Sequence, residues 1–453
     1  MSIEALRLPT SHSETVQALN DHACGLREAK CYETALIALR RALALDPMQH
    51  AVWGNLGCVL WNMGRYQEAE EPLRRATFLA PSHGPHWGNL GLLYSSLKRN
   101  DEAADCFDKC VAHAINEQHR QGAIWDRSLM RLRAGDWARG CEDYEVRIPL
   151  RGPDLYPKMP VPTWQGEPLD GKTLYVQAEQ GIGDRILFSR YFQVIKDRWP
   201  TCRILACVNE RLLDLLWEFR HIVEFLPTGV PWPDDIDYGV FQASLVRWLS
   251  PDIGSVPPDP GLILKRVRTA QAKGTFKPPK PNQNLFQIGV AWTGNPEMQR
   301  NADRSIPLQK LLALAEDPRL CLYGFQVGPG EEQIGQLGAH ELICNLGPDL
   351  AKLGPVAAGA AMLEMDLIIT SCTATAHLAG ALGVPCWTLL CTDAYWVWLD
   401  DRSDCVWYPD TRLFRQSVPG DWDPVLAEVR AELTKPCDAF DDEANDLGEI
   451  VHG

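Results

Sequence analysis

Small and large apolar residues recur along the first third of the chain with a period of 34 residues. Ala35, Ala69 and Ala103 mark the period, and the positions four and seven residues after each alanine are again apolar. A unit of this length can bury its apolar face only against a neighbouring unit, so the repeat predicts a stack of paired helices. The other members of the pattern are Leu39, Leu73 and Phe107, then Ala42, Ala76 and Cys110, and the matched triplets Trp53, Leu56, Gly57 and Trp87, Leu90, Gly91.

This combination of small, aromatic and proline positions resembles the tetratricopeptide repeat (TPR), in which each unit is a pair of antiparallel helices. Pro47 and Pro81 close two of the units. A degenerate fourth unit follows a short insertion and runs from Trp125 to Tyr144. Because TPR arrays mostly bind protein segments along their concave face, the resemblance implies a protein partner for residues 12–147.

After Thr173 the pattern changes to short apolar runs that alternate with longer amphipathic stretches. Strands that alternate with helices indicate a parallel sheet covered by helices on both faces. The alternation stops in a stretch rich in Pro and Gly and then restarts, so we expect two doubly wound domains that face a cleft. The predicted strands are 174–177, 204–208, 288–292, 321–327, 366–370 and 385–390, and the predicted helices are 185–198, 210–219, 308–315 and 374–382.

A chain of 453 residues is too long for one hydrophobic core, which also favours several domains. The predicted fold class is α plus α/β, a helical solenoid followed by two Rossmann-like domains. The predicted boundaries are 12–147 for the repeats, 148–170 for a Pro-rich connector, 171–265 and 285–435 for the two α/β domains, 266–284 for the linker between them, and 436–453 for an acidic, disordered tail.

Composition narrows the functional classes. The formal net charge of −15 argues against a general surface for nucleic acid or anionic membranes, although it permits a local basic pocket for a phosphorylated ligand. The fifteen cysteines are scattered and lack CxxC pairs, so we expect reduced core cysteines in a cytoplasmic protein and no metal site. We expect no signal peptide and no transmembrane helix, because no suitable apolar run is present.

The first candidate for chemistry is the turn 178–184, Ala-Glu-Gln-Gly-Ile-Gly-Asp, between a predicted strand and a predicted helix. Its glycines allow a ligand to approach the backbone closely. Asp184 would lie at the carboxyl end of the strand, where open α/β sheets bind ligands, and its carboxylate could take a proton from an attacking hydroxyl. The alternative interpretation is that Asp184 only caps the helix.

The second candidate is the segment 371–377, Ser-Cys-Thr-Ala-Thr-Ala-His, which also joins a strand to a helix. Hydroxyl groups and free backbone N–H groups at a helix N-terminus suit the diphosphate of a nucleotide. His377 could donate a hydrogen bond to a phosphate or to a sugar oxygen. Ordinary capping by serine and threonine, with a packed histidine, is the alternative.

The third candidate is the segment 292–295, Trp-Thr-Gly-Asn, which ends a strand and is followed by Arg300, Asn301, Asp303 and Arg304. Arginines just beyond a strand's carboxyl end are suitable phosphate ligands, and solvated loop charges are the alternative. Aromatic side chains also gather in the last third, where core or interface packing is favoured over stacking on a ligand. They are Tyr395, Trp396, Trp398, Trp407, Tyr408 and Trp422.

Together these segments resemble a bacterial TPR protein fused to a heptosyltransferase-like glycosyltransferase of family 9, with the GT-B architecture of two facing Rossmann-like domains. The resemblance covers residues 16–434 and rests on five segments. They are 178–184, 292–295, 304–307 (Arg-Ser-Ile-Pro), 376–383 (Ala-His-Leu-Ala-Gly-Ala-Leu-Gly) and 412–416 (Arg-Leu-Phe-Arg-Gln). The layout is also similar to that of O-linked N-acetylglucosamine transferases and of bacterial flagellin-modifying enzymes, in which TPRs stand beside a transferase.

The resemblance implies metal-independent, inverting transfer of a sugar from a nucleotide-sugar to a hydroxyl of a protein bound by the TPRs, without a cofactor. Flagellin or another cell-surface protein is the implied acceptor class, and dimerisation through an end repeat is a further expectation. The resemblance assigns the role of base to Asp184. It assigns loop roles to Gln180, Gly181 and Gly183, and donor binding to Trp292, Gly294, Asn295, Arg304, Gln326, Ser371, Cys372, Thr373, Ala374, Thr375 and His377.

The chain also departs from the family at three places. Cys372 stands where an aspartate is usual, Ala357-Ala358 stands where an Asp-Thr pair is common, and Val397 stands where an arginine is common. These departures keep two alternatives open. One is a non-catalytic interaction scaffold that retains the fold, and the other is a transferase that acts on lipopolysaccharide or another glycan.

Overall fold

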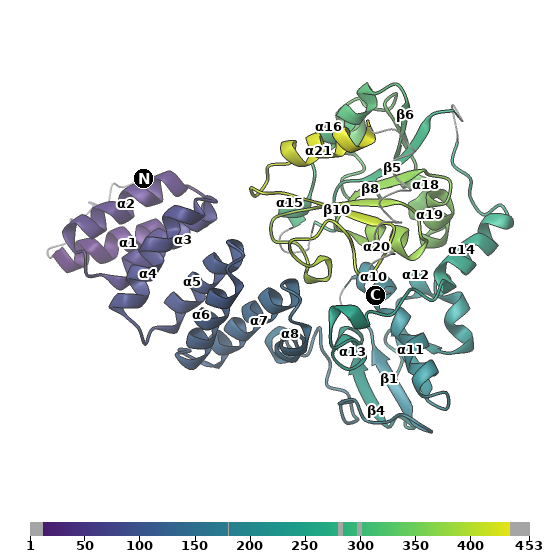
Figure 1. The fold of residues 1–453 in the computed structure, drawn as a ribbon, viewed down its shortest axis with the longest axis horizontal. Coiled ribbons are helices and arrows are strands. Elements are labelled where there is room, and N and C mark those ends of the chain that lie inside the picture. The colour runs from purple at the N-terminus through teal and green to yellow at the C-terminus, as the bar shows by residue number, and fades with distance from the viewer. Residues whose placement is uncertain (1–11, 180, 280–283, 297–300, 435–453) are drawn as a thin grey trace, which may run out of the picture. The chain divides into compact units, whose positions relative to one another are not determined.

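A computed structural model describes residues 12–179, 181–279, 284–296 and 301–434, and the predicted acidic tail 436–453 lies outside them (Figure 1). The chain divides into two units, which are described separately. The first unit contains the chain up to Pro160 together with two later segments, Val246–Ser255 and Tyr395–Asp400. The second unit contains Val161–Leu245, Val256–Ala394 and the chain from Asp401.

The first unit is built from consecutive pairs of antiparallel helices, as the 34-residue period predicts. The repeat alanines Ala35, Ala69 and Ala103 are fully buried, because a small side chain lets the two helices of a pair approach closely. Gly57 shows how close this is, since a Cβ atom there would lie 2.4 Å from Leu73. The helices are α1 (His12–Glu28), α2 (Tyr32–Leu45), α3 (His50–Asn62), α4 (Tyr66–Leu79), α5 (Gly84–Ser96), α6 (Asn100–Ala112), α7 (Glu117–Arg133), α8 (Trp137–Tyr144) and the short α9 (Arg147–Arg151).

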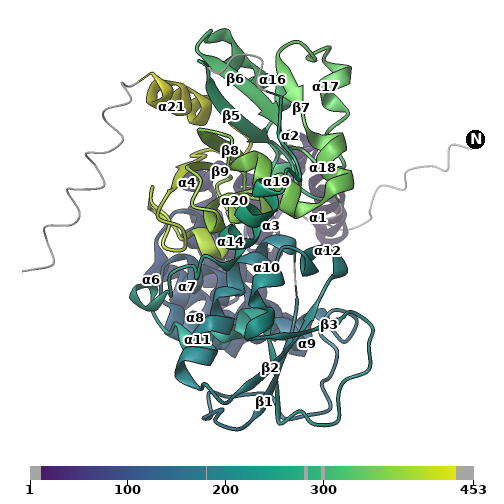
Figure 2. The ribbon, with the colours of Figure 1, turned by 90° about the vertical axis from the view of Figure 1, so that its right-hand side faces the viewer.

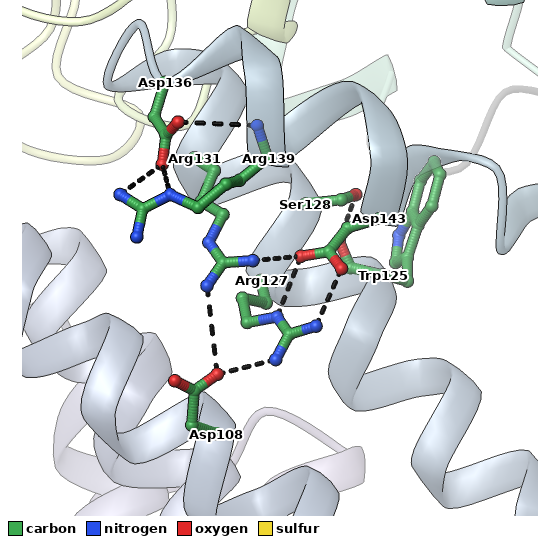
Figure 3. Close-up of polar contacts among 8 residues, drawn as sticks. All are labelled: Asp108, Trp125, Arg127, Ser128, Arg131, Asp136, Arg139 and Asp143. Carbon is green, nitrogen blue, oxygen red and sulfur yellow. Dashed lines mark hydrogen bonds and ion pairs between the residues drawn. The ribbon is translucent and has the colours of Figure 1, made fainter.

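Ion pairs hold the degenerate fourth repeat together (Figure 3). The carboxylate of Asp143 in α8 accepts two hydrogen bonds from Arg127, at 2.7 and 2.8 Å, and one from Arg131 at 2.6 Å. Arg127 also donates to Asp108 of α6 at 2.6 Å. Both arginines belong to α7, so this network joins three helices in a repeat whose apolar pattern is weak.

The segment Tyr395–Asp400 packs within the first unit although it follows much of the second unit in sequence. Trp396 is buried and meets the rings of Trp137 and Tyr144 edge to face, with centroids 5.8 and 5.9 Å away. The carboxylate of Asp400 lies 2.5 Å from the ammonium of Lys98, and its backbone N–H donates to the carbonyl of Arg133 at 2.8 Å. Trp396 and Trp398 therefore fill the core, as expected for the aromatic cluster.

The second unit contains two parallel sheets (Figure 2). The first sheet has the strand order β3-β2-β1-β4, so β1 pairs with β2 on one side and with β4 on the other. Its strands are β1 (Thr173–Gln177), β2 (Arg203–Val208), β3 (Glu224–Pro227) and β4 (Tyr238–Phe241). The helices along this part of the chain are α10 (Ile182–Phe188), α11 (Arg190–Arg198), α12 (Glu210–Leu213) and α13 (Leu245–Leu249). Helix α13 belongs to the first unit except for its first residue.

The second sheet has the strand order β10-β9-β8-β5-β6-β7, and its apolar core includes Ile288, Leu322 and Ile369. Its strands are β5 (Phe286–Ala291), β6 (Leu320–Gly324), β7 (Ile343–Asn345), β8 (Leu367–Ser371), β9 (Cys386–Leu390) and β10 (Thr411–Arg415). Its helices are α14 (Leu262–Ala272), α15 (Asn301–Arg304), α16 (Leu308–Leu312), α17 (Gln333–Gln336), α18 (Gly347–Leu353), α19 (Pro355–Met362), α20 (Ala374–Ala381) and α21 (Asp423–Leu433).

The predicted fold class is confirmed: helical TPRs precede a region of two parallel sheets with helices. Several local predictions were wrong. The helix predicted over 185–198 is interrupted at Ser189, and only Glu210–Leu213 and a 3-10 turn at Trp217–His221 form in 210–219. Helix α14 occupies the first part of the predicted linker. Strands β3, β4, β7 and β10 were missed, and the first three have only three or four residues, which carry too little periodicity.

Candidate active site

The carboxyl ends of three strands bring the predicted segments to the places where each sheet reverses its strand order. In the first sheet the order changes beside β1, which leads into the turn 178–184. In the second sheet β5 and β8 are neighbours from which the chain winds outward in opposite directions, and they lead into 292–295 and 371–377. Ligands of open α/β folds bind at these switch points.

Asp184 caps helix α10. Its Oδ2 atom accepts a hydrogen bond from the backbone N–H of Gly181 at 3.0 Å. Nearby, the buried Glu179 accepts from the backbone N–H of Ala243 at 2.9 Å, which ties the turn to the segment after β4. Gln180 lies outside the described residues. Asp184 therefore does cap the helix, as the alternative interpretation expected. Its carboxylate is partly buried and lies at the switch point of the first sheet.

Gly183 brings the first and second candidate segments into contact. A Cβ atom at this position would lie 2.5 Å from Cδ2 of His377 and 3.3 Å from the Cα atom of Ala374. Only glycine permits this approach of α10 to α20. The turn after β1 and the helix start after β8 thus form one site, although they lie far apart in the sequence.

The segment after β5 is held by a polar network. Gln326 accepts hydrogen bonds from the backbone N–H groups of Trp292 and Thr293, at 3.2 and 3.1 Å, so its role here is to support the loop. The amide oxygen of Asn301 accepts from the N–H of Gly294 at 3.2 Å, and its Nδ2 donates to Thr293 at 3.0 Å. Asn295, the next residue, is exposed.

Arg304 links the third candidate segment to the second. Its Nη1 atom donates to the backbone carbonyl of Cys372 at 3.1 Å, and its Nε donates to Asn301 at 3.1 Å. A Cβ atom on Gly294 would lie 2.3 Å from the guanidinium, so this glycine makes room for the arginine. The guanidinium therefore lies beside the start of α20.

The start of α20 has the features of an anion site. Thr373 is the N-cap residue and makes no capping hydrogen bond through its side chain, while Ala374 and Thr375 begin the helix and are partly exposed. Two fully buried atoms at these strand ends, Ser371 Oγ and Trp292 Nε1, have no hydrogen-bond partner among the described residues. Backbone N–H groups at such a helix start attract negative charge.

His377 is buried and neutral. Its Nδ1 atom lies 3.3 Å from the hydroxyl of Tyr408. Burial, with a smaller contribution from the nearby Arg190, lowers the pKa of His377 to about 3. His377 therefore packs as a buried side chain beside the start of α20, and its part in donor binding stays a prediction.

Sequence reasoning missed the buried Arg190. Its guanidinium donates to the backbone carbonyls of Pro257 and Trp407, at 2.9 and 3.0 Å, and its Nη2 lies 3.7 Å from Asp259. Burial raises the pKa of Asp259 above its usual value, and the charge of Arg190 offsets only part of this rise. An arginine within an amphipathic helix gives no signal in the sequence that distinguishes it from a solvated one.

The described residues hold no group of three His, Cys, Asp or Glu side chains placed to bind a metal ion. Within the same residues, no helix is both long enough and apolar enough to cross a bilayer. The described cysteines are all free thiols.

A family model matches part of the helical unit, and a known protein is similar over most of the chain. The family model described as tetratricopeptide repeat matches residues 20–83 and 55–117. Protein FlbA of Caulobacter vibrioides is 27% identical over an alignment of 462 positions, which covers 93% of this chain and 73% of that protein.

Solved structures give weaker likenesses. A mutant O-GlcNAc transferase from Thermobaculum terrenum covers 84% of each chain at 16% identity, with a TM-score of 0.30. A MamA protein covers 31% of this chain and 74% of its own length at 20% identity, with a TM-score of 0.28. Scores this low do not establish a shared arrangement of the whole chains, so the site is interpreted from its own geometry.

Proposed function

We propose that the protein is a metal-independent, inverting glycosyltransferase that takes a sugar from a nucleotide-sugar and transfers it to a protein hydroxyl. One observation carries this proposal: Arg304 and the uncapped start of α20 lie together where β5 and β8 diverge. A guanidinium and a helix N-terminus at a switch point suit a diphosphate. In this scheme residues 171–265 hold the acceptor side and residues 285–435 hold the donor.

The chemistry assigns a step to each side of the site. The acceptor oxygen forms a bond to the anomeric carbon of the sugar while the bond from that carbon to the diphosphate breaks. Asp184 receives the acceptor proton, and Arg304 with the N–H groups of Thr373, Ala374 and Thr375 stabilises the nucleoside diphosphate that leaves. The TPRs recruit the acceptor, for which flagellin or another cell-surface protein is a candidate.

The test compares Arg304→Ala with Asp184→Asn. Thermal-shift and calorimetric titrations with UDP, GDP, ADP, CMP and dTDP and their sugar conjugates would identify a nucleotide that binds the wild type. Arg304→Ala should weaken that binding by about 1.5–3 kcal/mol, the scale of a charge-assisted hydrogen bond. The control is Arg319→Ala, which removes an exposed arginine just before β6 that pairs with Asp317.

Asp184→Asn should leave nucleotide binding intact and abolish sugar transfer, because the amide oxygen can still cap α10 but cannot take a proton. Transfer at the wild-type rate by this variant would remove Asp184 from the mechanism. Unchanged nucleotide affinity in Arg304→Ala would contradict the proposal that Arg304 binds the phosphates of the donor.

A non-catalytic scaffold is the second candidate function. Two observations favour it: Asp184 already serves as a helix cap, and the buried Cys372 stands where the resembling family usually has an aspartate. Failure of all the nucleotides to shift the unfolding of the wild type would support the scaffold over the enzyme.

A further inference from the structure

The first sheet of the second unit borders a hollow of about 570 Å³ at the amino ends of β2 and β3. The first two residues of each strand line it: Arg203 and Ile204, and Glu224 and Phe225. Figure 2 shows the two strands beside β1, with which β2 pairs in parallel. Because the turn 178–184 follows the carboxyl end of β1, the hollow lies at the other end of this sheet from that turn.

The lining of the hollow carries more positive than negative charge, although the chain as a whole has a formal net charge of −15. Its charged side chains are Lys196, Arg203, Arg220 and Glu224. Arg203 is compensated, because it donates to Glu224 at 2.8 and 3.2 Å and pairs with Asp235. Lys196 and Arg220 therefore carry the excess positive charge.

Arg220 is held by an aromatic ring and keeps its donors available. It lies in the 3-10 turn Trp217–His221, and its guanidinium is 3.9 Å from the centroid of the Trp217 ring. Stacking fixes the plane of a guanidinium while its N–H groups point outward along the edge. In the part of the chain that the structure describes, no carboxylate or carbonyl accepts from Arg220, so these groups can bind an anion.

Lys196 is fixed by neutral acceptors. Its ammonium donates to the backbone carbonyls of Pro200 and Cys202, at 2.8 and 2.6 Å, and no described carboxylate pairs with it. The thiol of Cys202 adds no negative charge, because burial raises its pKa to about 11. An ammonium has three donors, so one of them is left for a ligand.

Apolar side chains complete the lining, and they are Ile204, Ile222, Val223 and Phe225. The volume lies within the range of roughly 300–1,000 Å³ that is usual for small-molecule sites. The hollow therefore has room for an organic group beside an anion.

We propose that this hollow binds a phosphorylated small molecule, with the phosphate against Arg220 and Lys196 and the organic group against Ile222, Val223 and Phe225. A phosphate monoester carries a charge of about −1.5 to −2 at pH 7, so it compensates both cations, whereas a carboxylate compensates only one. A free molecule is proposed over a lipid, because the net negative charge of the chain opposes an anionic membrane. The inference goes beyond the proposed function, since it adds a second ligand site.

The test is a titration of the full-length protein with phenyl phosphate, followed by phosphorus NMR. It uses the Arg304→Ala variant, so that the candidate donor site does not contribute. Adding Arg220→Gln should weaken binding about ten- to hundredfold. Adding Arg198→Gln instead should leave it unchanged, because this exposed arginine stacks on Trp199 and does not line the hollow. No binding of phenyl phosphate, or equal affinity in the two double variants, would overturn the proposal.

Benzoate and inorganic phosphate are the comparison ligands. Both should bind more weakly than phenyl phosphate, because benzoate carries a single charge and inorganic phosphate has no apolar group. Equal or tighter binding of either would overturn the stated chemistry. Binding of vesicles that contain phosphatidate, abolished by Arg220→Gln, would overturn the assignment to a free molecule. Because neither a nucleotide-sugar nor Arg304 takes part, these results are independent of whether sugar transfer occurs.

Discussion

Gly183 allows the turn 178–184 to contact the segment 371–377. Its backbone has no side chain between it and His377, and any Cβ atom would come within 2.5 Å of that ring. His377 cannot move away easily, because it is buried beside Tyr408. The packing of α10 on α20 therefore requires glycine at this position.

Gly183→Ala should destabilise the second unit by about 1–3 kcal/mol, the usual range for overpacking in a core, and should weaken nucleotide binding. Urea unfolding and nucleotide titration would measure both effects. Gly181→Ala is the matched control, since a Cβ atom there would meet only Asp184 Oδ2, at 3.5 Å, and φ is −82°. Equal stability of the two variants would show that α10 and α20 are not closely packed in solution.

Asp126 in α7 gives the clearest pH-dependent effect at the residue scale. Burial raises its pKa from 3.8 to about 6, and Arg133 on the same helix lowers it only in part. A raised carboxyl pKa means that the folded protein holds the proton more tightly than the unfolded chain. The stability contributed by this group is therefore greatest below about pH 4 and is lost as the pH rises towards 6.

Asp126→Asn should make the protein more stable at pH 7.5, by roughly 1–3 kcal/mol, because an ionised carboxylate is no longer buried. The gain should shrink as the pH falls and vanish below about pH 4. Urea unfolding of both proteins across this range would measure it. A variant that is less stable than the wild type at pH 7.5 would show that the ionised carboxylate has a favourable partner.

At the scale of elements, the fourth repeat depends on charge where the first three depend on small apolar residues. Asp143 is largely buried, with 10% of its side chain exposed, and receives hydrogen bonds from two arginines of α7 (Figure 3). Asp108 takes part in the same network with 54% of its side chain exposed. Burial, rather than the number of ion pairs, should decide how much each aspartate contributes.

Asp143→Ala should destabilise helices α6 to α8 by about 3–5 kcal/mol, because two largely buried guanidinium groups lose their buried carboxylate and keep only the exposed Asp108. Asp108→Ala should change stability by no more than about 1 kcal/mol. Hydrogen exchange resolved by peptide would report faster exchange in α7 and α8 for the first variant alone. Similar exchange in both variants would contradict the role given to burial.

At the scale of the whole molecule, the chain order does not follow the two units. The segments Val246–Ser255 and Tyr395–Asp400 belong to the helical unit by their packing, although each lies in sequence between parts of the α/β unit. Gly135, with φ +85°, makes room for Ile253 of the first of these segments, since a Cβ atom on the glycine would lie 2.6 Å from that side chain. The helical unit is therefore complete only with residues from the second half of the chain.

Trp396→Ala should loosen the end of the repeat stack, because the edge-to-face contacts with Trp137 and Tyr144 are lost. Truncation of a buried tryptophan costs about 3–5 kcal/mol. Hydrogen exchange in α8 and in 395–400 should rise, while exchange in β5 and β8 stays as in the wild type. Trp217→Ala, which truncates a side chain that is 50% exposed, is the control. Unchanged exchange in α8 would contradict the packing of Trp396 in this unit.

Local pattern was sufficient for much of the fold. The 34-residue period predicted the repeats, and the apolar runs predicted β1, β2, β5, β8 and β9 to within a few residues. Gly383 is a further local example. It adopts a left-handed φ of +64° directly after the C-cap residue of α20, the position where a glycine commonly ends a helix. Local pattern failed at β3, β4, β7 and β10, which depend on the hydrogen bonds that neighbouring strands supply.

The sequence by itself determined the repeats, the alternation of strands and helices, and the segments at strand ends, because each depends on residues close together in the chain. Only the tertiary structure decided that Gly183 meets His377, that Arg304 reaches Cys372, and that Trp396 belongs to the helical unit. These contacts join residues far apart in the sequence, and their geometry follows from packing, which no local pattern records.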